Sequence, residues 1–166
     1  MIERTVLETI KEVAEMLLEK LQIKGTVKAL EAEEESVRVE VETEEPQLLI
    51  GEQGQALLEV QHVVRLIARK KLEEAPLIAL DINEYRKSRE TYLRELANTA
   101  ADEVALLKKE KELPAMSSQD RRIVHMVISE RQDVSSESMG EEPERRIVVR
   151  IKEKEEKEEK DSPNPG

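Results

Sequence analysis

Two glycines three residues apart, Gly51 and Gly54, separate an apolar run from the pattern of an amphipathic helix, and this arrangement constrains the fold more than any other feature of the sequence. Glycine lacks a Cβ, so the backbone can turn sharply at both positions and a ligand can approach it closely. The apolar residues after the glycines recur at steps of three and four, which predicts a helix. They are Leu57, Val60, Val64, Ile67 and Ala68. The first amides of such a helix can face a phosphate, although a plain corner between two helices is the structural alternative.

The middle positions of this predicted loop are Glu52 and Gln53. A carboxylate opposes the attraction between basic side chains and phosphates that dominates the affinity for nucleic acids, so such a loop needs a neighbouring basic surface. Arg65 and Arg69 lie four residues apart on the predicted helix and are candidates for that surface. The alternative is a solvated helix face on which these arginines pair with glutamates.

Composition limits the class of protein. The 166 residues contain no Cys, only two aromatic residues (Tyr85 and Tyr92) and 38% hydrophobic residues, which suits one domain or two small ones. No apolar run approaches the roughly 18 residues of a membrane span, and the charged N-terminal segment is unlike a signal peptide. We therefore expect a cytoplasmic chain without an integral membrane segment. Two tyrosines exclude a surface that stacks several bases on aromatic rings.

Charge is distributed unevenly along the chain, whose formal net charge is −11. Residues 1–83 contain 10 Lys or Arg against 18 Asp or Glu, a net charge of −8. Residues 84–152 contain 14 of each kind and are neutral. Residues 153–166 contain 3 basic and 6 acidic residues and are expected to form a disordered acidic tail. Any basic binding surface is therefore local.

Residues 1–83 are predicted to form one domain with the order helix, strand, strand, helix, helix, strand. Alternation of Val37, Val39 and Val41 with charged residues is typical of a half-buried strand. The first helix should end with the help of Gly25, and a short helix should begin near Pro46. The predicted strands are Thr26–Glu31, Ser36–Thr43 and Leu77–Asn83, and the long helix after the glycines should run to about Glu74. This order, together with the glycine loop, resembles the type II KH domain (αββααβ), whose loop clamps nucleotide backbones.

A second domain is predicted over residues 84–152. It should contain a helix from about Glu84 to Lys111, a helix over Gln119–Glu130, and strands over Val134–Ser138 and Arg145–Lys152. Ser117 and Asp120 have the spacing of a capping box at the start of the second helix. The whole chain is therefore expected to be an α+β protein.

Arg121 and His125 lie four residues apart, and hence on one face of that second helix. In its context, ELPAMSSQDRRIVHMVISERQDVSSESMGEEPERRIVVRIK, the pair resembles the Arg-x-x-x-His motif of the R-3-H domain found at the C-terminus of the Jag/KhpB family of bacterial RNA-binding proteins. In that family a type II KH domain directly precedes the R-3-H domain. The resemblance implies single-stranded nucleic-acid binding, with Gly51 and Gly54 matching the KH loop. Basic positions of the similar pattern fall on Arg122, Arg145 and Arg146.

The resemblance implies a non-enzymatic RNA-binding protein, acting as an RNA chaperone or post-transcriptional regulator, with single-stranded DNA as an alternative ligand and a small standalone KH protein as the usual partner. Many members carry an extra N-terminal domain that has no counterpart in this sequence, so functions that depend on it are not expected. We expect no cofactor, metal or catalytic residue, because no nucleophile–base pair, nucleotide-binding loop or metal-ligand spacing occurs. The alternative is an acidic KH-like scaffold that has lost phosphate affinity and binds proteins, linked to cell-envelope or sporulation processes.

Overall fold

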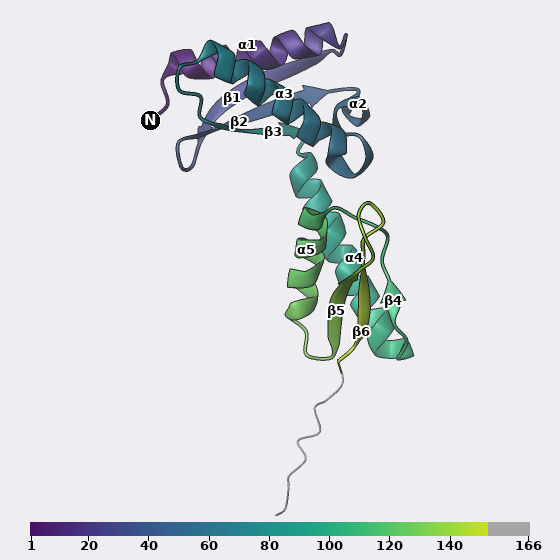
Figure 1. Ribbon diagram of the computed structural model, residues 1–166. Helices are drawn as coiled ribbons and strands as arrows, with labels where there is room; N and C mark the ends of the chain where they lie inside the picture. The colour runs from purple at the N-terminus through teal and green to yellow at the C-terminus, as the bar shows by residue number, and fades with distance from the viewer. Residues whose placement is uncertain (153–166) are drawn as a thin grey trace, which may run out of the picture. The chain divides into compact units, whose positions relative to one another are not determined.

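The computed structural model describes residues 1–152 and divides into two compact units (Figure 1). The first unit is Met1–Thr91 and the second begins at Tyr92, so the division lies inside helix α4 (Tyr85–Leu107), eight residues after the boundary expected from the sequence. The acidic segment 153–166, for which a disordered tail was predicted, lies outside the described residues. Within residues 1–152, no helix is both long enough and apolar enough to cross a lipid bilayer.

The first unit has the predicted order of elements. These are α1 (Arg4–Lys20), β1 (Gly25–Ala32), β2 (Ser36–Thr43), α2 (Pro46–Ile50), the 3-10 turn η1 (Glu52–Gly54), α3 (Gln55–Lys71) and β3 (Leu77–Ile82). The strands form one sheet in the order β1-β2-β3, with β1 and β2 antiparallel and β2 and β3 parallel. The short helix begins at Pro46 as predicted, because proline at the first helical position loses no hydrogen bond.

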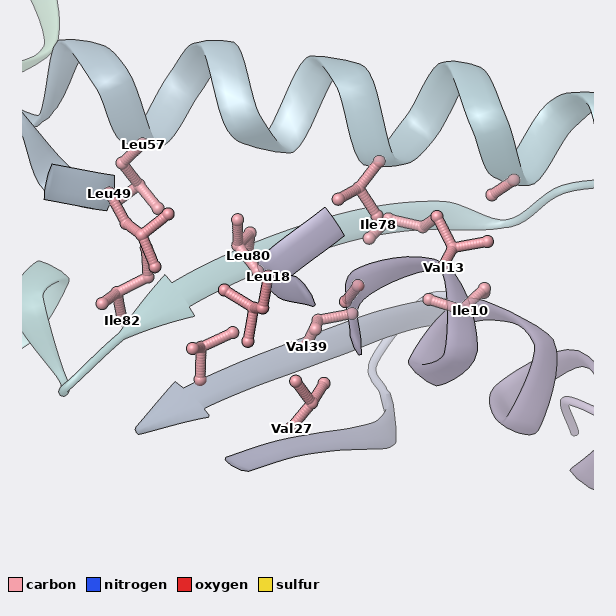
Figure 2. Packing of buried hydrophobic residues seen from close by; sticks show 14 of the residues in the cluster. Ile10, Val13, Leu18, Val27, Val39, Leu49, Leu57, Ile78, Leu80 and Ile82 are labelled. Atoms are coloured by element: carbon pink, nitrogen blue, oxygen red, sulfur yellow. The ribbon is translucent and has the colours of Figure 1, made fainter. Parts of the chain in front are cut away.

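The core of the first unit lies between this sheet and the two long helices. Val37, Val39 and Val41 of β2 are buried, and the charged residues between them face outward. Figure 2 shows Leu18 of α1 and Leu80 of β3 among the buried side chains of this core, with α3 running along the sheet. Each Å² of apolar surface that is buried stabilises the fold by roughly 25 cal/mol. The apolar face of the alternating strand therefore packs against the apolar faces of the two helices.

The end of α1 differs from the prediction. The helix ends at Lys20, and Gly25 does not stop it but opens β1 opposite Thr43. A Cβ at Gly25 would lie 2.8 Å from the carbonyl oxygen of Glu42, so close strand approach explains the glycine. The chain instead reverses at Gln22, whose φ of 58° is left-handed.

The outer edge of β3 is closed by side chains from neighbouring helices. Arg65 Nε donates to the Ile78 carbonyl at 2.7 Å, and the Gln61 side-chain oxygen accepts from the Leu80 amide at 2.9 Å. Arg86 Nε donates to the Leu80 carbonyl at 3.1 Å. Backbone groups that an edge strand leaves unpaired are thereby satisfied within the unit.

The second unit packs α4 and α5 (Ser118–Ser129) on a sheet of β4 (Lys111–Glu112), β5 (Val134–Met139) and β6 (Arg146–Ile151). The strand order is β4-β6-β5, with antiparallel pairs. Strand β4 was not predicted, because two residues are too short to show a periodicity. The predicted cap of α5 is present: Ser117 Oγ accepts from the Asp120 amide at 3.2 Å.

Candidate nucleic-acid interface

The glycine loop of the first unit takes backbone conformations that favour glycine. Gly51 has φ 66° and ψ −170°, and Gly54 has φ 85°. A Cβ at Gly51 would lie 2.6 Å from the Cβ of Ala56 in the first turn of α3. Residues with a side chain rarely adopt the φ and ψ angles of Gly51, so the backbone conformation of the loop requires a glycine at this position.

Gly54 is buried, and the ring of Tyr85 lies against it. A Cβ at this glycine would lie 2.8 Å from Tyr85 Cε1, so the two glycines hold the loop against α3 and the first turn of α4. Glu52 and Gln53 are exposed and are the side chains that the loop presents to solvent. The loop therefore offers a carboxylate at its centre.

The two arginines expected to support the loop have different surroundings. Arg65 is half-buried and its Nε donates to the β3 backbone, as described above. Arg69 is exposed, as is the neighbouring Lys70. The side chain of Arg65 is therefore already engaged in closing the sheet edge, while Arg69 extends into solvent.

Arg121 of α5 is a buried residue, with only 7% of its surface exposed. Its guanidinium donates to the Met116 carbonyl at 2.6 Å and to Glu142 Oε1 at 2.7 Å. Because Glu142 belongs to the turn between β5 and β6, this ion pair ties the turn to the helix. The neighbouring Arg122 points outward and is exposed.

His125 is half-buried between α5 and β5. Its Nδ1 lies 2.7 Å from Ser136 Oγ, and its Nε2 lies 2.8 Å from Ser138 Oγ. Burial lowers the pKa of His125 below its ordinary value, and the positive charge of Arg121 lowers it further. The imidazole is therefore a neutral group held at both nitrogens.

Arg121, Arg122 and His125 meet at an open pocket of about 440 Å³. The remaining lining residues are Ser118, Met126, Ser129 and Ser138. The lining residues include two arginines and three serines and none is acidic, although the carboxylate of Glu142 lies 2.7 Å from the guanidinium of Arg121. In a chain of net charge −11, the exposed Arg122 beside these serines makes the pocket a candidate site for an anion.

The other two arginines of the expected basic set do not join the pocket lining. Arg146 pairs with Met139 across the β5–β6 ladder, whereas Ser138 pairs with Ile147. Neighbouring residues of a strand face opposite sides of a sheet, so Arg146 lies on the side away from Ser138, where it contacts Glu112 at 2.9 Å. Arg145 is exposed just before β6.

Sequence reasoning missed the serines of the pocket. Ser118 begins α5 and Ser129 ends it, while Ser138 lies on a different element, 13 residues after His125. The alternation of Ser136 and Ser138 along the predicted strand was the available signal. It did not show that this side of the strand faces α5.

Residues 91–150 match the family model of the R-3-H domain. Curated relatives named "RNA-binding protein KhpB" also match, including one from Clostridium symbiosum that is 31% identical over 119 residues, covering 72% of this chain and 54% of the relative. The protein of that name from Bacillus subtilis is 31% identical over 116 residues, covering 69% of this chain and 56% of the relative. The one from Streptococcus pneumoniae is 28% identical over 114 residues, covering 69% and 35%.

This chain therefore aligns with about a third to just over half the length of these relatives. The domain match and the names of these relatives support the resemblance to the Jag/KhpB family. The matching domain contains Arg121, Arg122, His125 and Ser138.

Proposed function

We propose that this chain is a non-enzymatic protein that binds single-stranded RNA through the pocket between α5 and β5. The observation that carries this proposal is the pocket lining, in which the exposed Arg122 and three serines come together and no lining residue is acidic. Phosphate contacts supply most of the affinity for nucleic acids, and arginine with hydroxyl groups is a suitable donor set for them. The names of the relatives, all RNA-binding proteins, point to the same ligand.

Within the pocket the two arginines have separate roles. Arg122 is exposed, so its five N–H donors are placed to reach a phosphate. Arg121 is buried, and its guanidinium is engaged by the Met116 carbonyl and the Glu142 carboxylate, so it holds the pocket in shape instead of contacting a phosphate. The exposed Arg145, just before β6, is a further candidate for a peripheral phosphate contact.

We assign the first unit as a KH-like domain. Its element order and glycine loop support a second contact with the bound RNA. Glu52 makes this contact weak, because Arg69 lies near the opposite end of α3 from the loop, about 21 Å along the helix, and cannot offset the carboxylate there. Action as an RNA chaperone or post-transcriptional regulator in the cytoplasm, together with a small KH-domain partner, follows from the family resemblance. Single-stranded DNA is an alternative ligand, and competition with RNA distinguishes the two.

Fluorescence anisotropy of a labelled, mixed-sequence single-stranded RNA, at low and near-physiological salt, tests the proposal. Arg122→Ala should weaken binding and reduce the magnitude of the salt slope by about 1, because one phosphate contact is lost. Arg38→Ala is the matched control, since it removes the same charge from an exposed position on β2. Equal affinities and slopes for the two variants would remove the pocket from the binding site.

A second candidate function is a protein-binding scaffold, favoured by the exposed Glu52 in the loop and by apolar side chains on the outer surface of α3. Leu58, Val63 and Leu66 of this helix are 43%, 39% and 47% exposed. Strand addition at β3 is not a suitable mode, because its edge is already closed. If the chain binds no RNA and Glu52→Lys creates binding, the scaffold is favoured over the RNA-binding protein.

A further inference from the structure

Ser136 and Ser138 lie on the face of β5 that packs against α5. Their partners across the ladder, Val149 and Ile147, are both fully buried, which fixes the direction of this strand face. Each serine hydroxyl contacts one nitrogen of His125, at 2.7 and 2.8 Å. Only Ser138 of these two serines lines the pocket. The three side chains therefore form a short row that runs from the interior of the unit to the pocket.

The directions of these two hydrogen bonds are linked to each other. A neutral imidazole has one N–H donor and one nitrogen that accepts, so one serine must accept from His125 and the other must donate to it. Burial beside the cationic Arg121 keeps the ring neutral. The tautomer of His125 consequently decides which hydroxyl hydrogen is left for another partner.

The surroundings of the serines select one tautomer. Among residues 1–152, a nitrogen of His125 is the hydrogen-bond partner that the structure gives to each serine hydroxyl, but only Ser138 lines the open pocket, where solvent or a ligand can accept its hydrogen. A half-buried hydroxyl without an acceptor is costly, so Ser136 should donate its hydrogen to Nδ1. The proton of the ring then resides on Nε2 and is donated to Ser138 Oγ.

We propose that Ser138 is an RNA-contacting residue whose hydroxyl hydrogen points into the pocket and, beside Arg122, donates to a phosphate oxygen. His125 is then a positioning residue that occupies a lone pair of Ser138 Oγ and leaves its hydrogen for the ligand. This inference rests on the proposed function, and it assigns the contact to a residue of β5 instead of the histidine of the motif. With the opposite tautomer, the Ser138 hydrogen would be spent on the ring and only lone pairs would face the phosphate.

RNA titrations of serine variants of the full chain test the contact. Ser138→Ala should weaken binding about tenfold, in keeping with the loss of one hydrogen bond to a charged group. Ser138→Thr keeps the hydroxyl and should restore most of the affinity. Ser135→Ala is the control, because Ser135 is an exposed neighbour on the opposite face of β5 and should leave binding unchanged. Melting curves of all three variants establish that they fold.

Nitrogen-15 NMR of the histidine side chains tests the positioning step without RNA. The chain has two histidines, and the variant His62→Gln identifies the signals of His125. The expected spectrum has a protonated Nε2 and an unprotonated Nδ1, and Ser136→Ala should increase the population protonated at Nδ1. These tautomer signals would not respond in this way if His125 only filled space.

Three results would overturn the inference. A His125 ring protonated at Nδ1 in the unaltered chain contradicts the direction of the hydrogen bonds. Full RNA affinity in Ser138→Ala, with binding by the unaltered chain, contradicts the contact but leaves the proposed function standing. Failure of the unaltered chain to bind RNA at low salt contradicts the proposed function and the contact together.

Discussion

Replacing Gly51 by alanine should destabilise the first unit strongly, for two separate reasons. The backbone of this residue, with φ 66° and ψ −170°, lies in a region that costs a side-chain-bearing residue about 1–3 kcal/mol. The new Cβ would also lie 2.6 Å from the Cβ of Ala56 and 3.0 Å from its backbone nitrogen. Overlap of this kind typically costs another 1–3 kcal/mol, so Gly51→Ala should lower the free energy of unfolding by about 4 kcal/mol.

Gly140→Ala separates these two contributions. Gly140 has φ 86°, but a Cβ there would approach the Glu144 carbonyl oxygen only to 3.4 Å, which is ordinary contact. This variant should therefore lose only the backbone contribution, about 1–2 kcal/mol. Removing the Ala56 methyl in Gly51→Ala/Ala56→Gly should recover part of the overlap, after allowance for about 1 kcal/mol of lost helix propensity.

Hydrogen exchange of the slowest amides is the suitable assay, because the two units need not unfold together and each is followed through its own strands. Amides of β2 report on Gly51→Ala, and amides of β6 report on Gly140→Ala. A loss below about 1 kcal/mol in Gly51→Ala would refute the steric reasoning, since even the lowest backbone cost exceeds it. If the loss is as expected, RNA-binding tests of the loop belong at Glu52 and Gln53, where the side chains are exposed and the fold is kept.

Three further predictions concern the second unit. Arg121→Ala should lower its free energy of unfolding by about 2 kcal/mol, because the Met116 carbonyl loses its donor; an unchanged melting temperature would contradict this. Since the pKa of His125 is lower in the folded chain than its ordinary value of about 6.5, the unfolded chain binds more protons and stability falls as the pH drops below 6.5; His125→Asn should flatten that part of the pH–stability curve. The hydrogen bonds from Arg131 lower the pKa of Asp133 to about 2, so Asp133→Asn should reduce stability at neutral pH, and this difference should vanish as the pH falls towards 2 in acid titrations; a difference that persists there would have another cause.

Much of the fold could be predicted from the sequence, because local patterns decide it. The alternating valines of β2 and the proline that opens α2 each act within a few residues, and the structure has both elements where they were expected. The Ser117 cap is likewise local. Gly25 was misread because a glycine before a strand has the same sequence signal whether it ends a helix or allows a strand to approach closely.

The candidate site could be predicted only in part, because depth and strand direction are tertiary properties. A spacing of four places Arg121 and His125 on one side of α5, but it does not show that the β5–β6 turn would bring Glu142 over Arg121. The serine partners of His125 depend on how β5 packs against α5, which no spacing within the helix reveals. Arg146 was grouped with its neighbour, although adjacent strand residues face opposite sides.

The side chains that close β3 determine where the first unit can be cut. A fragment that stops at Asn83, where the strand pattern ends, would lack Arg86 and Tyr85, and with them the donor to the Leu80 carbonyl and the ring against Gly54. Such a fragment would expose part of a strand edge and invite self-association at the concentrations used for crystallisation or NMR. A fragment that continues to Thr91 retains both residues, so the edge of β3 stays covered and self-association through it is disfavoured.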